Sequence, residues 1–304
     1  MLFNRKRYDI RRDGITQSLL TKFMRCPLMG IYSTEGWRPK SLIDRVRFGN
    51  ICHHVCERLY QARGATDLKW VVDGALEEWE RRNWDPGEHR EDRFELDMAK
   101  AEAVMHQYVY AYPGDFIGDK TFKSTELTLR DIEFAGFRIM GKIDAIYKDK
   151  HGGLWLMETK TKARIQEEKL LQTLPNDFQN QFYLTLYETY TGRQVNGILY
   201  NVIRNPSSKP SGLPLLAYKT RLNREIGAKR PHFFKRYELN YTEADRDRFR
   251  AELIDKLAAA ERTLSGRRSV YRNETACWDC DFKDLCINGD EGPYTRGPLF
   301  QELD

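Results

Sequence analysis

Two short motifs near the middle of the chain carry carboxylates and a lysine that could build a reactive site. They are Gly141-Lys-Ile-Asp144 and Glu158-Thr-Lys160. Alternate residues of a strand share one face, so Glu158 and Lys160 project together, after a run whose same face is apolar. Burying a carboxylate and an ammonium at the end of an apolar face costs free energy unless the two groups pair or bind a metal. The motifs predict a site at the rim of the core, although the tripeptide alone also fits an ordinary Glu/Lys pair on an exposed strand.

Residues in two predicted helices could complete this site. His53 lies on a helix before the motifs, and Gln179 and Tyr183 are one turn apart on a helix after them. His54 follows His53 directly but points elsewhere on a helix, so we expect a packed or surface imidazole there.

The turn between the two motifs decides whether their carboxylates meet. A symmetric turn centred on 148–153 would place Asp144 opposite Met157 and leave Glu158 on the other face. The site therefore requires an odd-length loop or a bulge, for which Gly152-Gly153 is well suited.

A cysteine cluster near the C-terminus has the spacing of a metal site. Cys277 and Cys280 are followed by Cys286, a C-x2-C-x5-C pattern, and Cys26 is the best-placed fourth thiolate. Three clustered thiolates plus one remote thiolate favour an iron–sulfur cluster, with tetrahedral zinc as the alternative. The adjacent pair Cys52 and Cys56 is better explained as core packing.

Helices and strands that could position these residues follow one another along the chain. The apolar periodicity and the turn signals predict helices over 18–23, from about 49, over 70–84, 93–110 and 177–190, and from 242 to about 263. They predict strands over 134–147, 154–161 and 195–203. The order indicates an α/β protein without internal repeats.

Composition excludes several classes of protein. The 304 residues are 40% hydrophobic and 31% charged, with no apolar run long enough to span a membrane and no apolar core of a secretory signal near the start. Six cysteines are too few for a disulfide scaffold. Without a secretory signal we expect a reducing, cytoplasmic location, where clustered thiols indicate a metal site rather than disulfides.

The mild net charge of +5 is distributed unevenly. Between Arg204 and Arg236 the chain has nine Lys or Arg residues and a single acid, Glu225. Aromatic residues are interleaved with them: Tyr218, Phe233, Phe234 and Tyr237. Cations bind phosphates and aromatic faces stack on unpaired bases, so the run fits a single-strand groove, while a solvated basic loop is the alternative. The groove residues that we expect are Arg204, Lys219, Arg221, Lys229 and Arg230.

Taken together, the motifs resemble the RecB-type nucleases of the PD-(D/E)XK superfamily. Over about residues 18–190 they occur in the family's order: Gly49-xxx-His53, Gly141-xx-Asp144, Glu158-x-Lys160 and Gln179-xxx-Tyr183. The resemblance implies that His53, Asp144, Glu158 and the backbone carbonyl of Thr159 bind Mg²⁺ or Mn²⁺. It implies that Lys160 orients the attacking water or stabilises the charge on the phosphate, and that Gln179 and Tyr183 position DNA or the lysine.

The cysteine pattern is similar to that of the CRISPR-associated exonucleases and the nuclease domain of AddB. This similarity implies a [4Fe–4S] cluster held by Cys26, Cys277, Cys280 and Cys286, which would join the two ends of the chain.

These observations lead to one expectation for the whole chain. We expect a restriction-endonuclease-like α/β fold, a mixed central sheet flanked by helices, with an N-terminal helical region and a C-terminal Fe–S tail. It forms a single domain over 1–304: a helical region (1–130), a catalytic core (131–203), a basic segment (204–240), and a last helix with the cysteine cluster (241–304).

The expected function is that of a metal-dependent nuclease, an exonuclease acting on DNA ends or single strands. The alternatives are a structure-selective endonuclease and a catalytically idle DNA-binding module. A helicase, a recombinase or a CRISPR protein would be a fitting partner.

Overall fold

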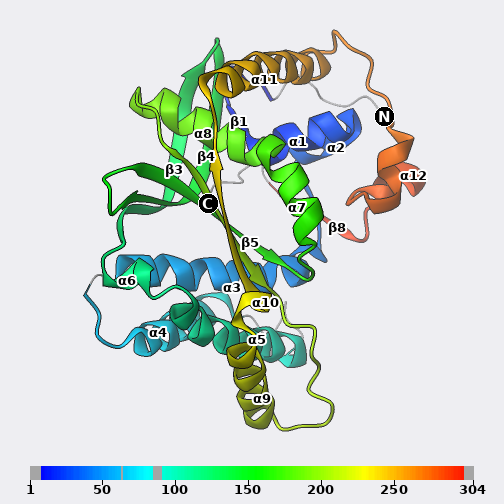
Figure 1. Ribbon diagram of the computed structural model, residues 1–304. Helices are drawn as coiled ribbons and strands as arrows, with labels where there is room; N and C mark the ends of the chain where they lie inside the picture. The colour runs from blue at the N-terminus through cyan, green and yellow to red at the C-terminus, as the bar shows by residue number, and fades with distance from the viewer. Residues whose placement is uncertain (1–7, 63, 85–90, 298–304) are drawn as a thin grey trace.

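The computed structural model describes residues 8–62, 64–84 and 91–297, which form a mixed sheet covered by helices on both faces (Figure 1). The six-stranded sheet has the order β1-β4-β5-β6-β7, with β3 also paired to β4. Its strands are β1 (Ile15–Thr16), β3 (Lys120–Phe134), β4 (Phe137–Asp149), β5 (Leu154–Lys162), β6 (Gly197–Arg204) and β7 (Phe234–Asn240). The predicted α/β class with a mixed central sheet is confirmed.

Two helical layers cover the sheet, each with its own hydrophobic core (Figure 1). One layer contains α3 (Leu42–Gln61), α4 (Leu68–Asn83), α5 (Glu91–Ala111) and α9 (Leu215–Ala228). The other contains α1 (Gln17–Arg25), α8 (Phe178–Thr191) and α11 (Glu243–Leu264). Short helices connect the larger elements: α6 (Gly114–Ile117), α7 (Glu167–Thr173), the 3₁₀ turn η1 (Leu174–Asn176) and α10 (Arg230–Phe233).

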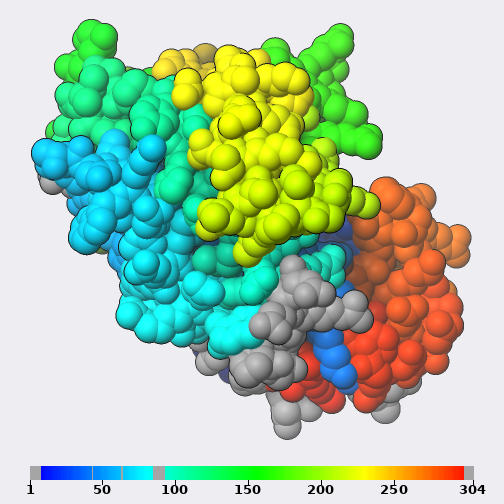
Figure 2. All heavy atoms as spheres, turned by 90° about the horizontal axis from the view of Figure 1, so that it is seen from below, coloured from blue at the N-terminus to red at the C-terminus, as the bar shows by residue number. Residues whose placement is uncertain are grey.

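A third, smaller core joins the two ends of the described chain. Strand β2 (Trp37–Pro39) pairs antiparallel with β8 (Tyr294–Arg296). Helix α2 (Pro27–Thr34) packs against the 3₁₀ turn η2 (Glu274–Asp279) and helix α12 (Lys283–Asn288). Their contact is a hydrophobic cluster that contains Cys26, Tyr32 and Phe282. In Figure 2 this C-terminal part forms a lobe beside the rest of the molecule.

The middle of β4 has a strand on only one side. Along one edge β4 pairs with β3 over its whole length. Along the other edge it pairs with β1 at Ile139 and Met140 and with β5 from Ala145 to Lys148. The segment 141–144 between these pairings therefore lies where the sheet splits, and this split holds the first of the two motifs.

Local chemistry explains most of the predicted helix ends. Cys26 ends α1, and Pro27, which has no N–H to lose, begins α2. Thr242 and Asp245 form a capping box at the start of α11. Gly192 ends α8 in the left-handed conformation at φ 65°.

The sequence did not predict every element. Strand β3 and several short helices and strands were missed, and the segment 204–236, for which no helix or strand was predicted, contains α9, α10 and the start of β7. Within the described residues, no helix combines the length and the apolar character needed to cross a membrane.

Candidate metal and nuclease centre

The hairpin between β4 and β5 brings the two carboxylate motifs together. Lys148 pairs with Leu154 and Ala145 with Met157, so the register places Asp144 opposite Glu158. The intervening loop 149–153 has an odd length, as the site requires. Its turn is held by Asp149, whose Oδ1 accepts the N–H groups of His151 and Gly153 at 2.8 Å each. The predicted odd-length loop is confirmed.

The side chain of Asp144 connects β4 to β5 at the point where the two strands move apart. Its Oδ2 accepts the backbone N–H of Thr159 at 2.6 Å. Burial would raise the pKa of Asp144, but the charge of His53, its hydrogen bond and the charge of Lys160 hold that pKa below the usual value. Asp144 is therefore an anion in the folded protein.

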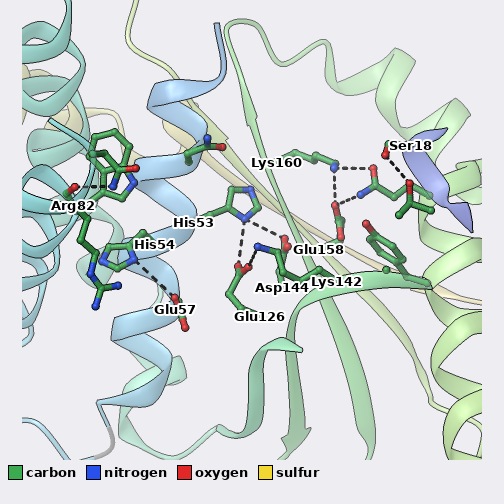
Figure 3. Close-up of a pocket in the computed structure, with 17 residues that line it drawn as sticks. Ser18, His53, His54, Glu57, Arg82, Glu126, Lys142, Asp144, Glu158 and Lys160 are labelled. Atoms are coloured by element: carbon green, nitrogen blue, oxygen red, sulfur yellow. Dashed lines mark hydrogen bonds and ion pairs between the residues drawn. The ribbon is translucent and has the colours of Figure 1, made fainter. Parts of the chain in front are cut away.

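Glu158 and Lys160, labelled in Figure 3, form a closed polar triangle with Gln179. Lys160 Nζ lies 2.6 Å from Glu158 Oε1 and donates to Gln179 Oε1 at 2.8 Å, and Gln179 Nε2 donates to Glu158 Oε1 at 2.8 Å. The second oxygen, Glu158 Oε2, is buried and has no hydrogen-bond partner among the described residues. A buried carboxylate oxygen without a partner costs about 1–3 kcal/mol, a cost that a bound cation would remove.

The pKa of Glu158 reflects the same crowding of acids. Burial first, and then the charge of Asp144, raise the pKa to about 7, against the opposing effect of Lys160. A cation in this position would favour the ionised carboxylate.

His53, Asp144 and Glu126 converge from three different elements (Figure 3). His53 Nδ1 lies 3.5 Å from Asp144 Oδ2 and 4.0 Å from Glu126 Oε1. Among the described residues, these form the one group of three or more His, Cys, Asp or Glu whose ligand atoms all lie within 4.8 Å of one another. Burial would lower the pKa of His53, but the charge of Asp144 and its hydrogen bond raise it to about 9. One imidazole and two carboxylates are a donor set that could hold a divalent metal ion.

Glu126 is the site residue that the sequence analysis missed. It lies on β3 between the pairs Thr125–Ala145 and Leu127–Ile143, which places it across from Asp144. Its φ is 48°, in the left-handed region that is unfavourable for a residue with a side chain. The alternation of Leu127, Thr128 and Leu129 could have revealed the strand, but no local signal reveals the approach to His53.

Two motif glycines allow helices to pack closely against the strands that carry the site. A Cβ on Gly141 would lie 2.9 Å from the ring of Tyr183 on α8. A Cβ on Gly49 would lie 2.9 Å from Thr161 Oγ1, so α3 rests directly on β5. These contacts place Tyr183 and His53 at the site.

The centre opens into a cavity of about 640 Å³. Besides the residues already described, its walls come from the start of α1 and from the facing sides of α3 and α4: Thr16, Ser18, Asn50, His54, Glu57, Trp79, Arg82 and Asn83. His54 lies in this wall with its Nε2 3.4 Å from Glu78, and its side chain is 13% exposed. The cavity thus extends well beyond the three carboxylates, as an extended substrate would require.

The structure gives the residues of the basic segment different surroundings. Lys219 Nζ pairs with Glu102 at 2.6 Å, Arg221 binds the carbonyl of Lys209, and Arg230 donates to Gln107 at 2.9 Å. None of the five cations predicted for the groove lines the cavity.

The expectation of base stacking fails for three of the interleaved aromatics. Tyr218, Phe233 and Phe234 are buried in the core, because α9, α10 and β7 turn these side chains inward. They have no open face to offer a base.

The four cysteines of the predicted cluster lie around one small pocket. Cys26, Cys277, Cys280 and Cys286 all line it, although Cys26 is far away along the sequence. Cys26 Sγ accepts the backbone N–H of Asn273 at 3.4 Å. Cys52 and Cys56, by contrast, are buried in the core under α3, where they pack as expected.

The sheet, its flanking helices and the carboxylate–lysine centre define a nuclease of the restriction-endonuclease-like class. A family model described as the PD-(D/E)XK nuclease superfamily matches residues 15–287, and the chain belongs to this superfamily. No curated protein matches.

Two solved structures are similar over most of the chain. The crystal structure of SSO0001 has 17% identity and a TM-score of 0.34, covering 90% of this chain and 85% of its own. The crystal structure of "Putative exonuclease" from Eubacterium rectale has 10% identity and a TM-score of 0.45, covering 93% and 92%.

Proposed function

We propose that this nuclease hydrolyses DNA phosphodiester bonds with a bound Mg²⁺ or Mn²⁺, as an exonuclease acting on ends or single strands. The observation that carries the proposal is the unpartnered, buried Glu158 Oε2 beside the converging His53, Asp144 and Glu126. Together these groups offer one imidazole and three carboxylates to a cation, and the backbone carbonyl of Thr159 is the further ligand expected from the sequence.

The residues of the chain divide the chemistry between them. A bound divalent ion supplies Lewis acidity to the phosphate and a water of lowered pKa. His53, Asp144, Glu158 and Glu126 would hold the ion. Lys160 stays protonated, because the charges of Glu158 and Asp144 outweigh the effect of burial and raise its pKa. Its ammonium, held in place by Gln179, orients the water or stabilises charge on a phosphate oxygen.

The preference for ends or single strands follows the resemblance of the sequence motifs to exonucleases. The lining of the cavity extends from the carboxylates as far as Trp79 and Arg82 of α4.

The test is a nuclease assay with anaerobically purified protein and Mn²⁺ or Mg²⁺, comparing end-labelled linear with circular single-stranded DNA. We expect metal-dependent loss of the linear DNA alone. Asp144→Ala should abolish the loss while DNA affinity is retained, and Lys160→Ala should abolish it as well. Lys150→Ala, an exposed lysine in the β4–β5 loop, is the matched control.

Each other outcome has a definite meaning. Cutting of the circle would assign an endonuclease instead. Full activity in Asp144→Ala would show that the metal site is misassigned, and no cutting by protein that binds both DNA and Mn²⁺ would favour an idle binding module.

We also propose that Cys26, Cys277, Cys280 and Cys286 hold a [4Fe–4S] cluster. Their arrangement around a common pocket supports this proposal. Among the described residues, no three of these sulfurs gather within 4.8 Å of one another. A tetrahedral zinc site would need sulfurs about 3.8 Å apart, from Zn–S bonds of about 2.3 Å. Iron and sulfide analysis of anaerobically purified protein tests the proposal, and stoichiometric zinc would contradict it.

A further inference from the structure

Two cations stand side by side at the ends of neighbouring strands. Lys162 is the last residue of β5 and Arg204 the last of β6, and they are directly paired in the parallel register. Paired residues point to the same face, on strands about 4.8 Å apart. Like charges directly opposite each other destabilise a sheet, so this placement is unfavourable unless an anion lies between them.

Within the described residues, no carboxylate forms an ion pair with either cation. Neither side chain takes part in an ion pair or a side-chain hydrogen bond there, and both are partly buried. The Arg204 Nε is fully buried and lacks a partner. By contrast Lys235, on the next strand, pairs with Glu167 at 3.0 Å. Of these three cations on neighbouring strands, Lys235 has a carboxylate partner among the described residues, whereas Lys162 and Arg204 have none.

The surroundings add positive charge to the pair. Burial first, and then the charge of Lys160, lower the pKa of Lys162. The nearest acid that acts on Lys162, Asp177, is already used as the N-cap of α8, where its Oδ1 accepts the N–H of Asn180 at 2.9 Å. On the other side His232 has its pKa lowered by burial and by the charge of Arg204. Positive potential is thus concentrated at the ends of these two strands.

This pair continues a line of cations that begins in the centre. Lys160 and Lys162 share one face of β5 and are about 7 Å apart along the strand. Lys160 lines the cavity, whereas Lys162 lies beyond it, where β5 ends between α3 and α7 (Figure 1). A DNA strand with one phosphate at Lys160 would bring a neighbouring phosphate to Lys162 and Arg204.

We propose that Lys162 and Arg204 clamp a DNA phosphate next to the one that is cut. The inference rests on the proposed function and adds a phosphate subsite to it. One ammonium and one guanidinium offer several donors to a single phosphate, and they would fix the register of the strand over the metal centre. The phosphate is either an internal diester or the terminal phosphate of a DNA end.

Binding without cleavage tests the clamp separately from the nuclease activity. The probe is a 3′-labelled single-stranded oligonucleotide, with a 5′-phosphate or a 5′-hydroxyl, followed by fluorescence anisotropy in EDTA at several salt concentrations. The variant is Lys162→Ala/Arg204→Ala. The control, Lys150→Ala/Arg193→Ala, removes the same charge from exposed positions near the starts of the same two strands.

We expect the double alanine variant to bind at least about tenfold more weakly, as the loss of a charged hydrogen bond implies. The slope of log K against log salt should become shallower by about 0.7, the value for one phosphate of a single strand. The control variant should bind DNA with the affinity of the wild type. The exchange variant Lys162→Arg/Arg204→Lys, which keeps both charges, should also bind with wild-type affinity. Because like charges are removed, thermal unfolding of the alanine variant should not occur at a lower temperature.

The two 5′ ends separate the two sources of the phosphate. A loss confined to the phosphorylated oligonucleotide assigns the terminal phosphate, and an equal loss for both assigns an internal diester. Wild-type affinity and slope in the alanine variant would overturn the clamp, and so would an equal loss in the control. Cleavage by the wild type, measured in parallel with Mn²⁺, distinguishes failure of the clamp from failure of the nuclease proposal.

Discussion

The carboxylate of Glu126 should contribute directly to metal affinity, and Glu126→Gln tests this without changing the size of the side chain. Glu126 Oε1 lies 4.0 Å from His53 Nδ1, so a cation held by His53 and Asp144 is within reach of its charge. For an ion about 4 Å from the carboxylate, a unit charge pair contributes about 4 kcal/mol at an effective dielectric constant of about 20.

Part of this attraction is offset in the native protein. Glu126 already pairs with Lys142 at 2.6 Å, and metal binding must weaken that pair. The side chain of Lys142 is 47% exposed, so its contact is worth at most about 1 kcal/mol. The amide of glutamine also keeps one oxygen donor. We therefore expect Mn²⁺ affinity to fall about 10- to 100-fold, or about 1.4–2.8 kcal/mol.

Isothermal titration of Mn²⁺ into metal-free protein measures the effect. Glu133→Gln, an exposed acid on the same strand, is the matched control and should bind Mn²⁺ like the wild type. Asp144→Asn should lose affinity more severely, because Asp144 faces both His53 and Glu158. Unchanged Mn²⁺ affinity in Glu126→Gln would refute the reasoning, since the ion would then be held without this carboxylate.

Three further predictions concern pH, the cysteine cluster and packing. In the metal-free protein His53 has a pKa of about 9 and Glu158 of about 7, and both must lose a proton to bind metal, so Mn²⁺ affinity should rise with pH. Calorimetry in buffers of different ionisation enthalpy should find up to two protons released below pH 7 and one between 7 and 9; a pH-independent affinity would contradict this. Cys280→Ser should remove the iron absorbance and lower the unfolding temperature, and full iron content in this variant would exclude Cys280 as a ligand. Gly197→Ala would place a Cβ 2.0 Å from the Leu239 carbonyl oxygen, so urea unfolding should show a loss of about 3 kcal/mol, and an unchanged midpoint would argue against this close packing.

Local patterns in the sequence were sufficient for most of the long helices and for the central hairpin. Caps and glycines act within a few residues, so Thr242, Gly192 and Pro27 set helix ends that a sequence reveals. The length of the β4–β5 loop was equally a local property. Alternation along the two strands requires an odd number of loop residues, and the loop 149–153 has an odd number. Strand β3 and helix α9 were missed because charged residues interrupt the apolar pattern of both segments.

The basic segment shows why composition alone misleads. Its excess of Lys and Arg was read as a groove, but Lys219 and Arg230 meet Glu102 and Gln107 from α5. Arg236 is likewise buried against Asp115 at 2.5 Å. Charge balance in a folded protein is set by neighbours in space, so a run that is basic along the chain need not be basic on the surface.

The sequence by itself determined the chemical types at the centre: Asp144, Glu158 and Lys160 on strands and His53 on a helix, in an order typical of one superfamily. The tertiary structure alone decided that Glu126 joins them, that Glu158 Oε2 lacks a partner, and that Lys162 stands beside Arg204. The reason is physical. Residue type and period are properties of a short segment, whereas the distance between side chains on different elements depends on how strands pair and how helices pack across the whole fold.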